Sequence, residues 1–297
     1  MFDDTSMSFA ALIGVVGSAT KAWRQLVKEM AAQDDRAYLT VSGACSAAEC
    51  LHAFPNGRAL RVTRLVRVSD LALVLETQSV HSQDLSSCFV QRMGAAGGLL
   101  HLLTGLRTLN LGRVSAQDTR CLSMLVNLKA LSLRGTRALN VEVLTSLVQL
   151  TKLDLSRTDI ANIRLLSALV NLRTLRLRKS QVTDARPLSS LITLSELDLS
   201  YTQIDDVGPL STLVKLQWLN LSLTEVRDLG PLSTLIELKT PQLHSTRLRD
   251  VQALSVLSAL QELNLGDTAV KDVGSLSTLV NLQTLMLFEC PELNDVH

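Results

Sequence analysis

The 297-residue chain is 46% hydrophobic but only 3% aromatic, and its 29 Lys and Arg residues nearly balance its 28 Asp and Glu residues. A net charge of +1 predicts no overall attraction to nucleic acid. Many leucines with few aromatics favour a core of thin, similar layers over one thick globular core.

The first predicted element is an amphipathic helix at residues 8–30. Its apolar positions, from Phe9 to Met30, fall at helical spacing with basic side chains between them. Asp3 and Asp4 precede it where a secretion signal requires basic residues, and its apolar run is too short to span a bilayer. We expect this helix to cover the open first layer of a repeat stack. Binding flat on a membrane surface is the alternative.

Residues 31–105 carry a weaker pattern. Four arginines from Arg58 to Arg67 alternate with aliphatic residues, which predicts a solvent-facing edge strand, with nucleic-acid contact as the alternative. The glycine-rich run at 94–98 lacks the Lys-Ser/Thr of a phosphate loop and predicts a flexible turn. The predicted domains are a helical and irregular N-terminal cap region at 1–69, a degenerate repeat at 70–105 and a regular repeat array at 106–297.

A 22-residue repeat organises that array. Nine successive copies, the last of them truncated, begin with a leucine at positions 106, 128, 150, 172, 194, 216, 238, 260 and 282. The most regular copy is 194–215, LSELDLSYTQIDDVGPLSTLVK. The leucines at repeat positions four and six alternate with polar residues, which predicts a short strand with its leucines pointing inward. Stacked copies would form a parallel sheet, so the array predicts an α/β solenoid.

Two polar columns recur in this array. Position nine holds a hydroxyl from Thr136 to Thr268, which predicts hydrogen bonds to the backbone. A catalytic nucleophile would instead need one activated copy beside a base. Position thirteen holds Asp or Asn, which predicts helix caps, with calcium binding as the weaker alternative. Pro241 replaces the inward leucine of position four and predicts either a local defect or a kink.

The pattern LxxLxLxxTxIxDVxPLSxLxxL resembles the short leucine-rich repeats of the phosphatase-regulatory and internalin type, which usually carry Asn where this chain has Thr. The Thr or Cys in that column, and the ending from Cys290 to Val296, most resemble the leucine-rich repeat proteins of kinetoplastid protists. The resemblance covers residues 106–297. It implies a curved horseshoe whose concave parallel β-sheet binds another protein, and it implies nothing catalytic.

The outward positions of the repeat carry the candidate binding surface. Residues 129–186 contain eleven Lys and Arg against four Asp and Glu, whereas residues 187–297 contain six against fourteen, so the array is a charge dipole. Basic side chains beside an outward Trp and Tyr are the residue mix of an interface hot spot. The predicted partner-binding residues on the concave face are Arg134, Lys152, Arg157, Arg176, Arg178, Lys179, Asp198, Tyr201 and Trp218.

These features predict a non-catalytic module that binds a protein partner with an acidic segment, as a scaffold or regulatory subunit. The five histidines have no partner at the spacing of a catalytic triad or metal site, so we expect no enzyme activity, no cofactor and no metal. The alternatives are a secreted or surface adhesion protein and an RNA-associated protein that uses the basic half. Nucleic acid is the weaker candidate, because the basic area is local.

The cysteines and the chain end add two expectations. Five cysteines without a CxxC pair predict free thiols and an intracellular location, cytoplasmic or nuclear. A disulfide cap formed by Cys45 and Cys50 is the alternative. The absence of a recognisable C-terminal cap predicts a longer natural product, or an end covered by a partner or by end-to-end self-association.

Overall fold

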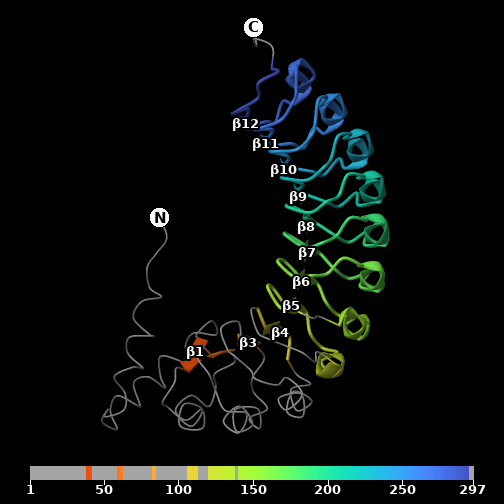
Figure 1. The fold of residues 1–297 in the computed structure, drawn as a ribbon, viewed down its shortest axis with the longest axis vertical. Coiled ribbons are helices and arrows are strands. Elements are labelled where there is room, and N and C mark those ends of the chain that lie inside the picture. The colour runs from red at the N-terminus through yellow and green to blue at the C-terminus, as the bar shows by residue number, and fades with distance from the viewer. Residues whose placement is uncertain are drawn as a thin grey trace, which may run out of the picture.

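The computed structural model describes residues 38–41, 59–62, 82–84, 106–112, 120–137 and 140–293. They build one twelve-stranded parallel sheet whose strands follow one another in chain order. Strands line the inner, concave side of a crescent, and short 3-10 helices line its outer side (Figure 1). The predicted solenoid with a concave parallel sheet is thereby confirmed. The predicted helix at 8–30 lies outside the described residues.

In the described residues, each of the strands β4 to β11 is followed by one 3-10 helix. The strands are β1 (Tyr38–Val41), β2 (Ala59–Val62), β3 (Ser82–Asp84), β4 (Thr108–Asn110), β5 (Ala130–Ser132), β6 (Lys152–Asp154), β7 (Thr174–Arg176), β8 (Glu196–Asp198), β9 (Trp218–Asn220), β10 (Thr240–Gln242), β11 (Glu262–Asn264) and β12 (Thr284–Met286). The 3-10 helices are η2 (Arg120–Met124), η3 (Val141–Ser146), η4 (Arg164–Ala168), η5 (Arg186–Ser190), η6 (Gly208–Thr212), η7 (Gly230–Thr234), η8 (Gln252–Val256) and η9 (Gly274–Thr278).

Strands β1 to β3 extend the sheet upstream of the regular array. β2 pairs with β1 on one side and with β3 on the other, and β3 pairs with β4. The predicted edge strand is therefore wrong for Ala59–Val62, which is an interior strand. The starts of β1, β2, β3 and β4 lie 21, 23 and 26 residues apart, so the constant interval that reveals the later repeats is absent there.

The core is a stack of leucine layers. In the repeat at 194, Leu194, Leu197, Leu199, Leu210 and Leu213 are all fully buried. Neighbouring strands pair without a shift in register, so each inward leucine lies over its equivalent in the next repeat. A stack of this kind shares its apolar burial between neighbours, which makes each layer dependent on the next.

The hydroxyl column binds backbone, as predicted. The Thr202 hydroxyl donates to the Leu199 carbonyl oxygen at 2.6 Å, which closes the turn after β8. The same bond recurs at Thr158, Ser180, Thr224, Thr246 and Thr268. Thr136 departs from the pattern and donates to the Leu111 carbonyl of the preceding repeat. These side chains are buried and satisfied inside the turns.

The Asp and Asn column accepts a backbone N–H at the start of the 3-10 helices η3 to η9, as predicted, but only Asn140 is itself the N-cap residue, and the others lie one residue before it. The Asp206 carboxylate accepts the Gly208 N–H at 2.7 Å, at the first residue of η6. Equivalent bonds are made by Asn140, Asn162, Asp184, Asp228, Asp250 and Asp272. At Asp184 the Arg186 guanidinium also donates to the carboxylate and holds its pKa below the usual value. Each acidic side chain therefore has a partner within its own turn.

Replacing Asp206 with alanine should lower the free energy of unfolding by about 1 kcal/mol, because the Gly208 N–H loses its acceptor. Urea unfolding measured by circular dichroism tests this. The matched control is Asp205→Ala, which removes another exposed carboxylate in the same turn. Equal losses in the two variants would show that the cap contributes nothing specific.

Pro241 makes one irregular junction in the sheet. Pro241 is buried and pairs in register with Leu219 of β9. On its other side, β10 pairs with β11 only at Gln242 and Asn264, whereas the neighbouring junctions each pair three residues. Proline has no backbone N–H to donate, which accounts for the reduced pairing.

Candidate functional site

The strands present outward side chains at repeat positions three and five, on either side of the buried leucine at position four. In β9 these are Trp218 and Asn220, which flank buried Leu219. Because the strands are parallel and unshifted, position-three residues of successive repeats form one row and position-five residues form another. The rows are the floor of the concave face.

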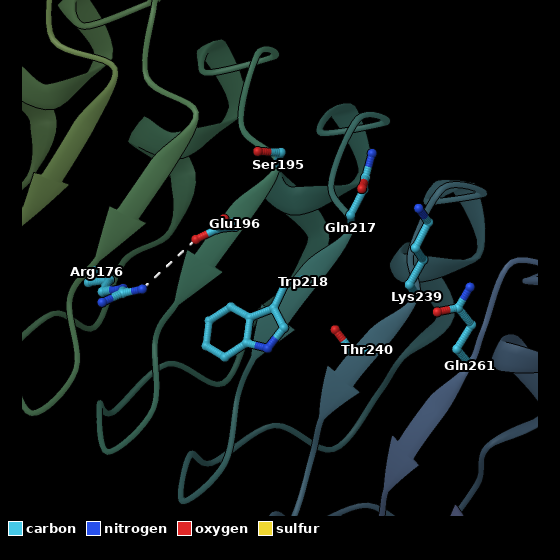
Figure 2. A pocket seen from close by; sticks show the side chains of 8 residues that line it. All are labelled: Arg176, Ser195, Glu196, Gln217, Trp218, Lys239, Thr240 and Gln261. Carbon is cyan, nitrogen blue, oxygen red and sulfur yellow. Dashed lines mark ion pairs between the residues drawn. The ribbon is translucent and has the colours of Figure 1, made fainter. Parts of the chain in front are cut away.

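An open hollow of about 390 Å³ lies on this face, over the end of β7 and the starts of β8 to β11. Its lining residues are Arg176, Ser195, Glu196, Gln217, Trp218, Lys239, Thr240 and Gln261. The half-buried Trp218 indole lies between the Arg176 and Glu196 pair and Thr240 (Figure 2). A half-buried aromatic ring in a hollow offers apolar contact area that is already partly ordered.

The charges in this hollow remain accessible to solvent. The Arg176 and Glu196 side chains approach at 3.9 Å and are 53% and 46% exposed, so this ion pair is a weak one. Lys239 adds a second cation on the far side of Trp218. The hollow therefore holds two basic groups and one acidic group around an aromatic ring.

A second group of predicted residues lies beyond the other end of the strands. The Arg178 guanidinium and the Lys179 ammonium each lie 4.4 Å from the centroid of the Tyr201 ring. Tyr201 follows β8 by three residues, whereas Trp218 is the first residue of β9. The structure therefore divides the predicted binding residues into two surfaces, the hollow and the turns after the strands.

The turns after the strands have an unusual backbone at position eight. Seven residues there adopt φ between 53° and 59°: Arg157, Lys179, Tyr201, Leu223, Ser245, Asp267 and Glu289. Residues other than glycine rarely adopt this conformation. The inter-repeat hydrogen bonds stabilise it, as when the Tyr201 N–H donates to the Ser222 carbonyl at 2.9 Å. We call these seven residues the ridge.

The remaining predicted residues have separate surroundings. Lys152 at the start of β6 and Arg134 after β5 are exposed. Asp198 is buried, and its carboxylate accepts bonds from the Ser200 N–H at 3.0 Å and the Ser200 hydroxyl at 2.6 Å. Its charge is therefore engaged inside its own turn.

The sequence interpretation missed the position-two residues of the hollow, which are Ser195, Gln217, Lys239 and Gln261. They precede the strands, and none of them was among the nine predicted partner-binding residues. Position two is polar in successive repeats, and this pattern could have identified it as a solvent-facing position.

The described residues also bear on other functions. Among them, no group of three or more His, Cys, Asp and Glu side chains could hold a metal ion. In the same part of the chain, no helix is long and apolar enough to cross a membrane. Cys290 is a free thiol, and its sulfur donates to the Leu265 carbonyl at 3.2 Å.

Stacked strand, turn and 3-10 units define a solenoid repeat protein, and comparisons with known proteins identify its class. A family model of the leucine-rich repeat matches residues 190–208. Internalin C2 from Listeria monocytogenes is 31% identical over 63% of this chain and 83% of its own, with a TM-score of 0.62. The chain belongs to the leucine-rich repeat proteins. No curated protein matches it.

Two further structures are similar in fold. An internalin, inlF, from Listeria monocytogenes is 19% identical over 96% of this chain and 91% of its own, with a TM-score of 0.64. A leucine-rich repeat protein from Leptospira interrogans is 17% identical over 84% of this chain and 77% of its own, with a TM-score of 0.62. The leucine-rich repeat fold is a typical scaffold for protein interaction, and its members are generally non-catalytic. The finer resemblance to kinetoplastid proteins stays a prediction.

Proposed function

We propose that the hollow around Trp218 binds an acidic, extended segment of a protein partner, and that the protein acts as a scaffold or regulatory subunit. The observation that carries this is the half-buried Trp218 ring between accessible basic side chains on the concave face. Arg176 and Lys239 lie on either side of the ring and supply charged hydrogen-bond donors for carboxylates. An apolar side chain of the partner would pack on the indole.

The size of the face supports this proposal. Twelve parallel strands at about 4.8 Å spacing give a row longer than about 50 Å, which exceeds what a standard protein interface requires. Within such an interface a few aromatic and arginine side chains contribute most of the affinity. Trp218 and Arg176 are the residues of that type in the hollow.

The test begins with partners captured on the full chain by affinity purification and identified by mass spectrometry. We expect the combination of Trp218→Ala and Arg176→Glu to weaken binding of the true partner by at least about thirtyfold. The matched control is Lys215→Glu, which changes an exposed charge outside the hollow by the same amount. Equal affinity for the double variant and the wild type would overturn the proposal.

A secreted or surface adhesion role is the second candidate. The similarity to internalin C2 over 83% of that chain favours it. Both candidates use the concave face, so they differ in location rather than in binding chemistry. Fractionation of cells that express the natural gene separates them, because we expect the scaffold in the intracellular fraction and the adhesion protein outside it.

A second copy of this chain, bound end to end, is a further candidate partner. β12 exposes Leu285 and Met286, each 37% accessible, and Phe288 after it is 52% accessible. Exposed apolar side chains on an outer strand favour pairing with another chain. Met286→Lys should abolish such an assembly in light scattering, and an unchanged particle size would contradict it.

A further inference from the structure

The charges along the ridge are ordered so that one ridge is complementary to a second copy of itself that runs antiparallel to it. In chain order its side chains are two bases, a tyrosine, a leucine, a serine and two acids: Arg157, Lys179, Tyr201, Leu223, Ser245, Asp267 and Glu289. All are exposed except Ser245, which is half-buried. Read in the opposite direction, acids stand where bases stood and the leucine keeps the central place.

We propose that the protein pairs with a second copy of itself along this ridge, antiparallel, about a two-fold axis at Leu223. This pairing places Arg157 opposite the second copy's Glu289 and Lys179 opposite its Asp267. Tyr201 then faces Ser245, and the two Leu223 side chains meet at the axis. The interface is isologous, as a closed dimer requires.

The shape of the solenoid permits this pairing along the whole ridge. Each ridge residue follows its strand, β6 to β12, by three residues, and these strands follow the arc of the crescent in Figure 1. A rotation of 180° about the radius through the midpoint of an arc reverses the arc and preserves its curvature. At about 4.8 Å per repeat, the six intervals from Arg157 to Glu289 span about 29 Å. The two ridges would therefore stay in contact at both charged ends.

The ridge is also ordered before any partner binds. The backbone N–H groups of Arg157, Lys179 and Leu223 donate to carbonyls of the following repeat at 2.7, 2.9 and 3.0 Å. Stacking on the Tyr201 ring orients the Lys179 ammonium and the adjacent Arg178 guanidinium. Fixed side chains lose less conformational entropy on association.

The distribution of polarity fits an interface between copies of this chain. Tyr201 and Leu223 are 38% and 37% exposed and form an apolar centre, and the charges lie toward the two ends. A parallel alignment would place Arg157 against Arg157, so the charges select the antiparallel one. Most of the hollow lies at the starts of β8 to β11, the opposite end of the strands from the ridge, and remains open in the dimer.

The first test measures the oligomeric state of the full chain by sedimentation across protein concentrations. We expect dimers for the wild type, and at least about a tenfold higher dissociation constant for Lys179→Glu and for Asp267→Lys, because each places like charges opposite each other twice. The charge-matched controls Lys215→Glu and Asp205→Lys lie outside the ridge and should dimerise as the wild type does.

Mixing the two weakened variants provides the decisive measurement. In a heterodimer of Lys179→Glu with Asp267→Lys, one contact joins Glu to Lys and the other joins Lys to Asp, so both contacts are attractive. We expect an equimolar mixture to form dimers at concentrations where each variant alone is monomeric. This recovery also shows that both variants are folded.

Three results would overturn the proposal. The first is a monomeric wild type at about 100 µM, a concentration above the dissociation constants of most specific dimers. The second is that both single variants dimerise as strongly as the wild type. That result would mean that the copies associate end to end or through another surface. The third is a mixture that stays monomeric.

Discussion

Leu197→Ala is expected to lower the free energy of unfolding by about 3 kcal/mol. Leu197 is fully buried at the centre of β8, between Leu175 and Leu219 of the neighbouring strands. Truncation removes its contacts and leaves a cavity, and such substitutions cost about 2–5 kcal/mol. Because each layer supports the next, the loss should also reduce the cooperativity of unfolding across the array.

Chemical denaturation monitored by circular dichroism measures this effect. Val214→Ala is the control, because Val214 lies in the same repeat but is 46% exposed, and its truncation should change stability by less than about 0.5 kcal/mol. A loss below about 1 kcal/mol for Leu197→Ala would mean that the leucine layers are not the principal source of stability.

The fold of the described residues between 106 and 293 was predictable because nearly every repeat carries the same information. Leucines at fixed spacing specify the strand, Thr at position nine closes the turn, and Asp or Asn at position thirteen starts the 3-10 helix. Upstream, the intervals of 21, 23 and 26 residues between strands removed the periodic signal. The arginines near β2 therefore appeared to belong to an edge strand.

The binding surface was less predictable, because its geometry depends on local backbone conformation. Among the described position-eight residues with positive φ, only Gly135 is a glycine, so Tyr201 and its equivalents carry almost no glycine signal in the sequence. The inter-repeat hydrogen bonds that enforce this conformation exist only after stacking. Similarly, Asp198 resembled a free charge in the sequence, but the Ser200 two residues later engages it.

The residue types at repeat positions five and seven are correlated, and this correlation is not visible when each position is compared separately across the repeats. Where position five is Asp or Asn, position seven is Gly or Ser, and the side-chain oxygen accepts the position-seven N–H, as at Asn220 and Ser222. Where position five lacks this oxygen, position seven is large, as at Phe288. A Cβ added at Gly266 would clash with the Phe288 ring, so the glycine provides the space for its large neighbour.

Pro241→Leu is expected to stabilise the protein by about 1 kcal/mol. The change supplies the backbone N–H that β10 lacks toward β11, and a net hydrogen bond contributes about 1 kcal/mol. A leucine also buries more apolar surface at a position where both neighbouring strands have one, Leu219 and Leu263. Removing the proline also increases the conformational entropy of the unfolded chain, which lowers the free energy of unfolding by about 0.4–1 kcal/mol. The sum favours leucine.

The measurement is the urea midpoint of Pro241→Leu against the wild type, with amide hydrogen exchange at β10 and β11 as the local readout. Leu219→Pro in β9 is the reverse substitution and should cost at least about 2 kcal/mol, because it removes a ladder donor and the contacts of a fully buried leucine. If Pro241→Leu left exchange at β11 unchanged, the missing donor would not be the cause of the weak junction. If it instead reduced partner binding while raising stability, the proline would be retained for the shape of the concave face next to Trp218.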